Sequence, residues 1–472
     1  MISESRQRIT YIVGDYITTN VAWLLFNILR FYFININQTN YGSLWAFLTS
    51  HQLVLGQIFF PLMLLLIFYL SGYYNKVFLK SRLHEIVNTI STSFVGMLLI
   101  YFIALINDRI PDRLASYELM GILLGIMFFS VYLCRFCITQ VATHNIHRRV
   151  WSFNTLIIGT SQAAVKLEEK LRTSKKSMGF NIIGYVESYE GHESRNLNLP
   201  IYKLDELPQL CADYDIKNLI VIPHRQGIKA TMSLINKLFP LDLPMYISPD
   251  LYHLITTKAR VSNIVGEPLV DISRADMSDS TLNLKRVSDI IVSIIALIIL
   301  SPLLLILSIL VKCDSKGPVI YKQTRIGYHK KPFNIYKFRS MKVDAEANGP
   351  TLSTLDDPRI TKLGKIMRKY RLDELPQFWN VVIGDMSLVG PRPEREFYIK
   401  QIITKAPYYS LIHQVRPGIT SWGMVKYGYA SNVDEMISRL KYDLLYIENV
   451  SFAVDLKILF YTIHTVFTGK GI

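Results

Sequence analysis

Four long apolar runs in the first third of the chain constrain its fold more than any other feature. They occupy roughly residues 10–34, 52–74, 86–106 and 115–138. A helix needs about 20 consecutive apolar residues to cross the hydrocarbon core of a bilayer, and each run is long enough. Half of all residues are hydrophobic, which is high for a soluble protein. The sequence therefore predicts a membrane protein with four transmembrane helices within residues 1–145.

Basic residues around these runs indicate their orientation. Arg6 and Arg8 precede the first run, whereas residues 35–50, between the first and second runs, contain neither Lys nor Arg. The loop after the third run carries Arg109 and Arg113, offset by Asp108 and Asp112. Because basic loops favour the cytoplasmic side, we expect both ends of the bundle inside the cell. The other bases at these inner ends are Lys76, Lys80, Arg82, Arg148 and Arg149.

Charge and cysteine content narrow the classes of partner and site. The formal net charge is +15, which suits anionic lipids, phosphorylated substrates or nucleic acid. The four cysteines form no disulfide framework, and Cys134 and Cys137 lie inside an apolar run, where packing is the favoured interpretation. Asp15 lies near the inner end of the first run. We expect it at the membrane interface or as a helix cap, the alternative being a functional intramembrane charge.

Residues 150–272 have a soluble α/β texture. Because strands alternate with helices there, the pattern predicts a parallel sheet of Rossmann type. A dinucleotide site would require GxGxxG after the first strand, but this chain has Gly159, Ser161 and Ala164 at those positions. We therefore favour a structural or regulatory domain over one that binds a nucleotide. The expected strands are 154–159, 181–186, 217–223 and 243–248, with helices over 161–172 and 228–239.

A fifth apolar run, about 286–311, is interrupted by Ser301 and Pro302. Proline removes a helix hydrogen bond, and the preceding serine can satisfy the freed carbonyl. Both flanks are basic, with Lys285 and Arg286 before the run and Lys312 and Lys316 after it. Two basic flanks place both ends on the cytoplasmic side, which predicts a re-entrant helix, with a kinked spanning helix as the alternative.

Conspicuous basic motifs follow this run. In YKFRSM (336–341), apolar and basic residues alternate, so Lys337 and Arg339 should project from one face of a strand, as a pair suited to phosphate. GDMSLVGPRPE (384–394) holds Arg392 between two prolines, and VRPGIT (415–420) presents Arg416 in a similar turn. A rigid loop that presents one guanidinium suits recognition of a phosphate or a nucleobase, although a structural turn explains each motif alone.

The stretch RLDELPQFWN (371–380) places an acid pair, Asp373 and Glu374, before Pro376. Proline is favoured at the first helical position, so the pair is expected at a junction just before a helix. The helix dipole and nearby bases should lower the pKa of these carboxyls and keep them ionised. That state suits a nucleophile or a metal ligand, whereas helix capping with surface ion pairing is the structural alternative.

With these motifs in order, the C-terminal region resembles the bacterial polyprenyl-phosphate hexose-1-phosphate transferases, the monotopic phosphoglycosyl transferases. The four runs and the degenerate Rossmann-like domain resemble the large members of that family in architecture. The resemblance implies a mainly α (α+β) catalytic domain over 280–472 with a re-entrant helix. The matching pieces are Ser301-Pro302, GPVIYKQTRIG (317–327), YKFRSM, LDELPQFWNVVIGDMSLVGPRPE (372–394), RPGIT (416–420) and YDLLYIENVSFAVDLKILFYT (442–462).

The resemblance also implies a mechanism. Asp373 attacks the β-phosphate of a UDP-sugar and expels UMP, and undecaprenyl phosphate then takes the phosphosugar from Asp373. Mg²⁺ is expected at Asp373, while Glu374 assists the metal or the lipid phosphate. Lys337, Arg339, Arg392, Arg416 and Asp443 are the substrate-binding candidates.

The implied setting is the cytoplasmic face of the bacterial inner membrane, at the start of O-antigen, capsule or exopolysaccharide synthesis. The expected partners are a UDP-sugar, undecaprenyl phosphate and membrane lipid, without nucleic acid, and a homodimer is compatible with the resemblance. Two other classes compete. A nucleotide-sugar dehydratase or oxidoreductase would need a Tyr-x-x-x-Lys pair, which Tyr185 and Tyr189 do not form. A non-catalytic scaffold would tolerate substitution of Asp373.

Overall fold

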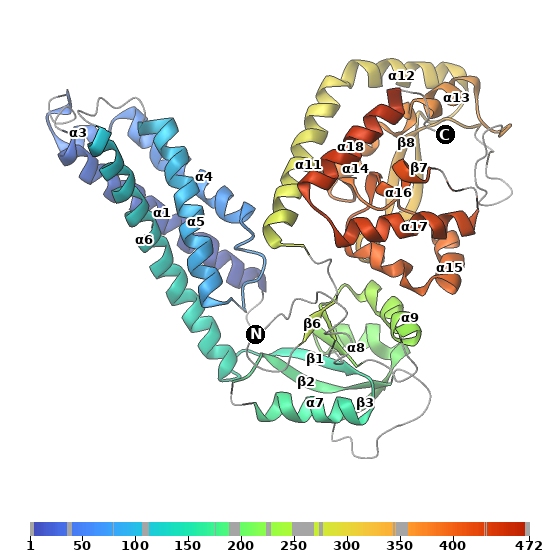
Figure 1. Ribbon diagram of the computed structural model, residues 1–472, viewed down its shortest axis with the longest axis horizontal. Coiled ribbons are helices and arrows are strands. Elements are labelled where there is room, and N and C mark those ends of the chain that lie inside the picture. The colour runs from blue at the N-terminus through green and yellow to red at the C-terminus, as the bar shows by residue number, and fades with distance from the viewer. Residues whose placement is uncertain are drawn as a thin grey trace. The chain divides into compact units, whose positions relative to one another are not determined.

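Figure 1 shows a computed structural model of the chain. The structure describes residues 4–34, 40–78, 80–105, 113–174, 176–187, 199–222, 228–247, 269–272, 277–342, 345, 357–428, 430 and 432–467. These residues divide into two compact units. The first lies within Met1–Ser152, Lys175–Gly179 and Ser278–Leu284, and the second within Phe153–Ser174, Phe180–Met277 and Lys285–Ile472.

The first unit contains the helices predicted from the four apolar runs. Four helical stretches are long and apolar enough to cross a membrane, which confirms the prediction of four candidate spans. The third of them ends in a π-helical turn, η1. The elements are α1 (Glu4–Phe33), α3 (Leu44–Leu48), α4 (His51–Leu70), α5 (Arg82–Ile100), η1 (Tyr101–Leu105) and α6 (Arg113–His147). The third loop, with Asp108, Arg109 and Asp112, lies outside the described residues.

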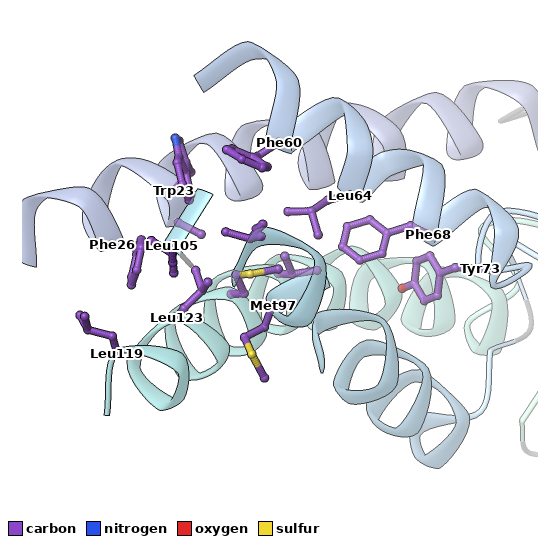
Figure 2. Packing of buried hydrophobic residues seen from close by; sticks show 14 of the residues in the cluster. Trp23, Phe26, Phe60, Leu64, Phe68, Tyr73, Met97, Leu105, Leu119 and Leu123 are labelled. Atoms are coloured by element: carbon purple, nitrogen blue, oxygen red, sulfur yellow. The ribbon is translucent and has the colours of Figure 1, made fainter. Parts of the chain in front are cut away.

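Large side chains from all four helices fill the middle of this bundle. Figure 2 shows Trp23 of α1 beside Phe60 of α4, whose ring centroids lie 4.5 Å apart. Leu64 of α4 and Met97 of α5 belong to the same buried cluster, as does Leu123 of α6. Lipid tails are as apolar as these side chains, so close packing and polar contacts have to hold such a bundle together.

A buried ion pair supplies one of those polar contacts. Arg135 on α6 donates to Asp15 on α1 at 2.9 Å (Nε–Oδ1) and 2.7 Å (Nη2–Oδ2), and both side chains are fully buried. Tyr74 also donates to Asp15, at 2.7 Å. The expectation that Asp15 caps a helix is therefore wrong, because it lies within α1 and its carboxylate bonds other parts of the bundle, whereas its expected place at the membrane interface stays a prediction. Its charge is compensated by a partner 120 residues away that periodicity could not reveal.

The second unit begins with the predicted parallel sheet. Its strand order is β3-β2-β1-β4-β5-β6, with β1 paired in parallel to β2 and β4, as in a doubly wound fold. Gly159, just after β1, has φ +126°, a conformation that favours glycine. The strands are β1 (Phe153–Ile158), β2 (Phe180–Glu187), β3 (Ile201–Lys203), β4 (Asn218–Val221), β5 (Met245–Ile247) and β6 (Val270–Asp271); the helices are α7 (Gln162–Thr173), α8 (Leu207–Asp213) and α9 (Ile228–Leu238), with η2 (Leu204–Glu206) and η3 (Phe239–Leu241).

The short strands β3 and β6 were not predicted, because they are too brief to show a period of their own. Pro223 and Ser248, at the ends of two predicted strands, lie outside the described residues. The sheet itself confirms the Rossmann-like expectation at the level of strand order and direction.

The fifth apolar run forms two helices, α11 (Asp279–Ile299) and α12 (Ser301–Asp314), that bend by 63° at their junction. Pro302 has no N–H to donate to the carbonyl of Ile298, four residues earlier. The hydroxyl of Ser301 donates to that carbonyl instead, at 2.8 Å. The predicted break thus lies at the serine–proline pair, and the orphaned carbonyl has its hydrogen bond.

The rest of the second unit is mainly helical, with two small sheets. The hairpin of β7 and β8 is antiparallel, and β9 pairs with β10 in parallel. Leu307 and Val311 of α12 pack against Phe338 and Met367, so the bent helix is part of this fold's core. The elements are β7 (Ile320–Ile326), η4 (Tyr328–Lys330), β8 (Pro332–Phe338), α13 (Lys362–Lys369), η5 (Leu372–Glu374), α14 (Gln377–Ile383), β9 (Ser387–Val389), α15 (Glu396–Lys405), η6 (Pro407–Gln414), β10 (Gly418–Thr420), α16 (Trp422–Lys426), α17 (Val433–Glu448) and α18 (Phe452–Phe467).

Candidate active site

The acid pair lies in a tight helical turn between α13 and α14. Arg371, which lies between the end of α13 and this turn, has a left-handed backbone (φ 53°, ψ 26°), which is uncommon for a residue with a side chain. The chain then forms the short 3₁₀ turn η5 and continues into α14 after Pro376. Asp373 is 7% exposed and Glu374 is 5% exposed. The predicted position just before a helix is correct, but both carboxyls are buried, and the surface ion pairing of the structural alternative is not found.

Three cations surround Glu374. The Nζ atom of Lys337 lies 2.7 Å from its Oε1, and guanidinium nitrogens of Arg371 and Arg392 lie 3.7 Å from its carboxylate. Burial raises the pKa of Glu374, but Lys337, followed by Arg392 and Arg371, outweighs burial and holds that pKa well below its usual value. Glu374 is therefore ionised at neutral pH, as predicted.

Asp373 has a different environment. Burial raises its pKa, and the neighbouring charge of Glu374 raises it further, while Lys337 and Arg368 act in the opposite direction. The net pKa lies above the usual aspartate value, so the expectation of a lowered pKa is wrong for Asp373. The sequence showed the helix start and the nearby bases but not the burial that outweighs them. The two carboxyls are thus electrostatically distinct.

A hydrogen-bonded asparagine connects the strand that carries Lys337 to α14, the helix that follows the acid pair Asp373 and Glu374 (the dyad). Asn380 of α14 is fully buried. Its Oδ1 accepts from the backbone N–H of Tyr336, at 3.0 Å, and its Nδ2 donates to the carbonyl of Asn334, at 2.8 Å. Because these contacts hold α14 against β8, they fix the strand on which Lys337 lies. Sequence reasoning missed Asn380, although it lies within the acid-pair motif.

The two arginine loops lie side by side. Gly390 and Gly418 permit this close approach: a Cβ atom on Gly390 would lie 2.3 Å from the carbonyl oxygen of Arg416. Arg392 reaches Glu374 and also contacts the sulfur of Met424, at 3.2 Å. Arg416 instead donates to the carbonyl of Gly384, at 2.9 Å, at the end of α14. The loops are therefore brought together, but the two guanidinium groups contact different partners.

Lys337 and Arg339 also contact different groups, contrary to the expectation of a phosphate-binding pair. Arg339 is buried and donates to the carbonyls of Val311 (3.1 Å), Ser315 (2.5 Å) and Pro318 (2.5 Å). These carbonyls follow or end α12, so Arg339 caps the bent helix.

Asp443 is buried on α17, against the start of α16. Its Oδ1 accepts from the backbone N–H of Gly423 at 3.1 Å. Burial raises the pKa of Asp443 to about 6, although Arg439 partly opposes this shift. Arg439 in turn forms a 2.5 Å ion pair with Glu394, which closes the PRPE motif.

Comparison with known proteins identifies the family. Residues 280–469 match the family model described as bacterial sugar transferase. The chain is 45% identical over 188 residues to an Aeromonas hydrophila UDP-N-acetylgalactosamine-undecaprenyl-phosphate N-acetylgalactosaminephosphotransferase, covering 40% of this chain but only 44% of that protein.

Two further relatives align over more of their length, and both are named UDP-glucose:undecaprenyl-phosphate glucose-1-phosphate transferase. The Klebsiella pneumoniae protein is 35% identical, covering 66% of this chain and 67% of that protein. The Escherichia coli K12 protein is 32% identical, covering 77% of each chain. The resemblance based on the motifs is confirmed, and the chain belongs to the bacterial sugar transferase family. The three relatives described here are named as undecaprenyl-phosphate sugar-1-phosphate transferases.

Proposed function

We propose that this enzyme transfers a sugar-1-phosphate from a UDP-sugar to undecaprenyl phosphate through a covalent intermediate on Asp373, and thereby initiates polysaccharide synthesis. One observation carries the proposal. Two adjacent buried carboxyls differ in charge compensation, because Glu374 is surrounded by Lys337, Arg371 and Arg392 whereas burial raises the pKa of Asp373. The carboxylate of Asp373 is therefore the more basic of the two and, once ionised, the stronger nucleophile, while Lys337 and Arg368 favour its ionised form. The names of the relatives support both substrates.

In the proposed first step, a carboxylate oxygen of Asp373 attacks the β-phosphorus of the UDP-sugar. The bond from that phosphorus to the bridging oxygen breaks, and UMP leaves with the bridging oxygen and its electron pair. In the second step a phosphate oxygen of the lipid attacks the same phosphorus, and the carboxylate of Asp373 is released. The sugar stays bonded to its phosphate throughout. Carboxylates are established nucleophiles toward phosphoryl groups, and such transfers depend on positioning and charge neutralisation.

The other site candidates take different parts in this proposal. Arg392, beside the dyad, is the candidate for binding a phosphate of the donor, and Lys337 keeps Glu374 ionised and in place. Arg416 holds the end of α14 through Gly384. The contacts of the other two candidates favour structural roles. Arg339 bonds the end of α12, and Asp443 connects α17 to α16.

The residues fit Mg²⁺ in a limited way. Within the described residues, no group of three or more His, Cys, Asp or Glu side chains could hold a metal ion. Glu374 is occupied by cations, which leaves Asp373 as the protein ligand. Mg²⁺ often binds through one or two carboxylates plus waters and substrate phosphates, so a single protein ligand is compatible with it. When bound, the ion would neutralise charge on the diphosphate.

The bent helix suits a site at a membrane surface. Basic residues lie at both ends of the apolar run that forms most of α11 and α12, and the 63° bend allows both ends to stay on one side. We propose that this pair dips into the inner leaflet from the cytoplasmic face of the inner membrane. A soluble nucleotide sugar and a membrane-bound lipid phosphate could then reach the same carboxylate.

Nucleotide release tests the proposed function. Solubilised full-length protein is incubated with Mg²⁺, undecaprenyl phosphate and a panel that includes UDP-glucose and UDP-N-acetylgalactosamine, because the relatives' names carry both sugars. We expect UMP that depends on the lipid and is lost in Asp373→Asn. Asp434→Asn is the matched control, since its side chain is 77% exposed. Release of UDP instead of UMP would rule out phosphosugar transfer.

A further inference from the structure

We propose that the side-chain amide of Gln377 donates a hydrogen bond to an oxygen of the phosphoryl group that is transferred at Asp373. The inference rests on the proposed function and assigns a substrate-contacting residue to the same site. It starts from a buried hydrogen-bond donor that lacks an acceptor.

Gln377 is the first residue of α14 and is 2% exposed. Its Nε2 atom is buried, and among the residues that the structure describes it has no hydrogen-bond partner. Buried side-chain amides are nearly always paired, because leaving a donor without an acceptor costs free energy. An unpaired amide at this depth therefore indicates an acceptor that is not part of the folded chain.

The backbone places Gln377 on the same face as the dyad. The chain is helical from η5 into α14, and the backbone N–H of Phe378 donates to the carbonyl of Leu375 at 3.2 Å. Residues three and four apart share a face of such a helix. Gln377 follows Glu374 by three positions and Asp373 by four, so its side chain lies on the helix face that carries the two carboxyls.

The acceptors next to Gln377 on this face already serve other donors. Oε1 of Glu374 accepts from Lys337 at 2.7 Å. Oδ1 of Asn380, three residues after Gln377, accepts from the backbone N–H of Tyr336 at 3.0 Å. By helical spacing, Gln377 is three residues from each of these engaged acceptors and four residues after the proposed nucleophile. Bonding of Asp373 to phosphorus would bring anionic phosphoryl oxygens to this face, and these are strong acceptors.

A preorganised donor of this kind stabilises charge as it develops during the transfer. It also destabilises the free protein, because it stays unpaired until the substrate binds. Stability and activity should therefore change in opposite directions when the amide is removed. A purely structural glutamine would lower both together.

The test compares Gln377→Met with Gln414→Met in the full-length solubilised protein. Gln414 is a matched control, because its half-buried amide is paired with the carbonyl of Ile272 at 3.0 Å. For Gln377→Met we expect an unchanged or higher melting temperature and a fall of about 10–100-fold in kcat for lipid-dependent UMP release, the size expected for the loss of one hydrogen bond to a charged group. Gln377→Glu, which keeps the size but loses the donor, should be impaired at least as much. Gln414→Met should keep its activity.

A second readout does not need turnover. In the Asp373→Asn background, UDP-sugar should raise the melting temperature, and Gln377→Met should reduce that rise. Normal kcat in Gln377→Met, or a melting temperature that falls with the activity, would overturn the inference. Comparing the wild type with Asp373→Asn tests the proposed function separately. If UMP release is lost in Asp373→Asn but not in Gln377→Met, the proposed function stands and the role of Gln377 is rejected. If the wild type releases no UMP, both are rejected.

Discussion

Replacing Lys337 with methionine should move the acidic limb of the activity profile to higher pH. Methionine keeps much of the length of the side chain but removes the ammonium group 2.7 Å from Glu374. Lys337 is the foremost cation acting on both carboxyls of the dyad. Without it the pKa of each carboxyl rises, so a larger fraction is protonated at a given pH.

The magnitude follows from the geometry. Breaking a fully buried ion pair costs about 3–5 kcal/mol. The side chain of Lys337 is 18% exposed, and Arg371 and Arg392 remain 3.7 Å from Glu374, so we take the lower part of that range, about 3 kcal/mol. Since one pKa unit corresponds to about 1.36 kcal/mol, the acidic limb should move up by about two pH units at most.

The assay is the pH dependence of kcat/KM for lipid-dependent UMP release, which reports on the free enzyme. Lys322→Met is the control, because Lys322 lies on the same hairpin but is exposed, near the ring of Tyr336. We expect a shift for Lys337→Met and none for Lys322→Met. Coincident acidic limbs in the wild type and Lys337→Met would refute the argument that Lys337 controls the ionisation of the dyad.

Three further variants test neighbouring parts of the site. Asn380→Ala removes both hydrogen bonds to β8, so we expect the free energy of unfolding to fall by about 2 kcal/mol. In a double-mutant cycle with Lys337→Met, the effects on kcat should be less than additive, and simple additivity would contradict a role through Lys337. Asp443 has a pKa raised to about 6, so its contribution to stability is present at low pH and is lost as pH rises through about 6. Asp443→Asn should flatten this part of the plot of melting temperature against pH, and an unchanged plot would argue against the raised pKa. Gly423→Ala would place a Cβ atom 2.6 Å from Cγ of Arg439, so we expect a melting temperature lower by several degrees, and an unchanged value would show that the α16–α17 contact yields easily.

Local chemistry in the sequence was enough to predict the bent helix. Ser301 and Pro302 identify a break, and the structure has a 63° bend there. The same logic placed Asp373 and Glu374 before a helix, as Pro376 indicates. Each of these predictions needed only residues a few positions apart.

Features that depend on distant partners could not be predicted in this way. Asp15 and Arg135 are 120 residues apart, and nothing in either apolar run identifies the other as its partner. Strand alternation placed Lys337 and Arg339 on one face. It could not show that Lys337 would pair with Glu374, or that Arg339 would bond carbonyls at the end of α12. The raised pKa of Asp373 likewise depends on burial by the folded chain.

The central claim is that Asp373 carries the phosphosugar, and the most direct test is the intact mass of the enzyme after brief incubation with the UDP-sugar and Mg²⁺, without lipid. The account predicts UMP in an amount equal to the active enzyme, together with a mass increase of one sugar phosphate that maps to Asp373 and disappears on addition of undecaprenyl phosphate. Asp373→Asn should show neither the adduct nor UMP. If wild-type enzyme releases UMP only when the lipid is present and never acquires the adduct, transfer is direct and the role of Asp373 as nucleophile is wrong.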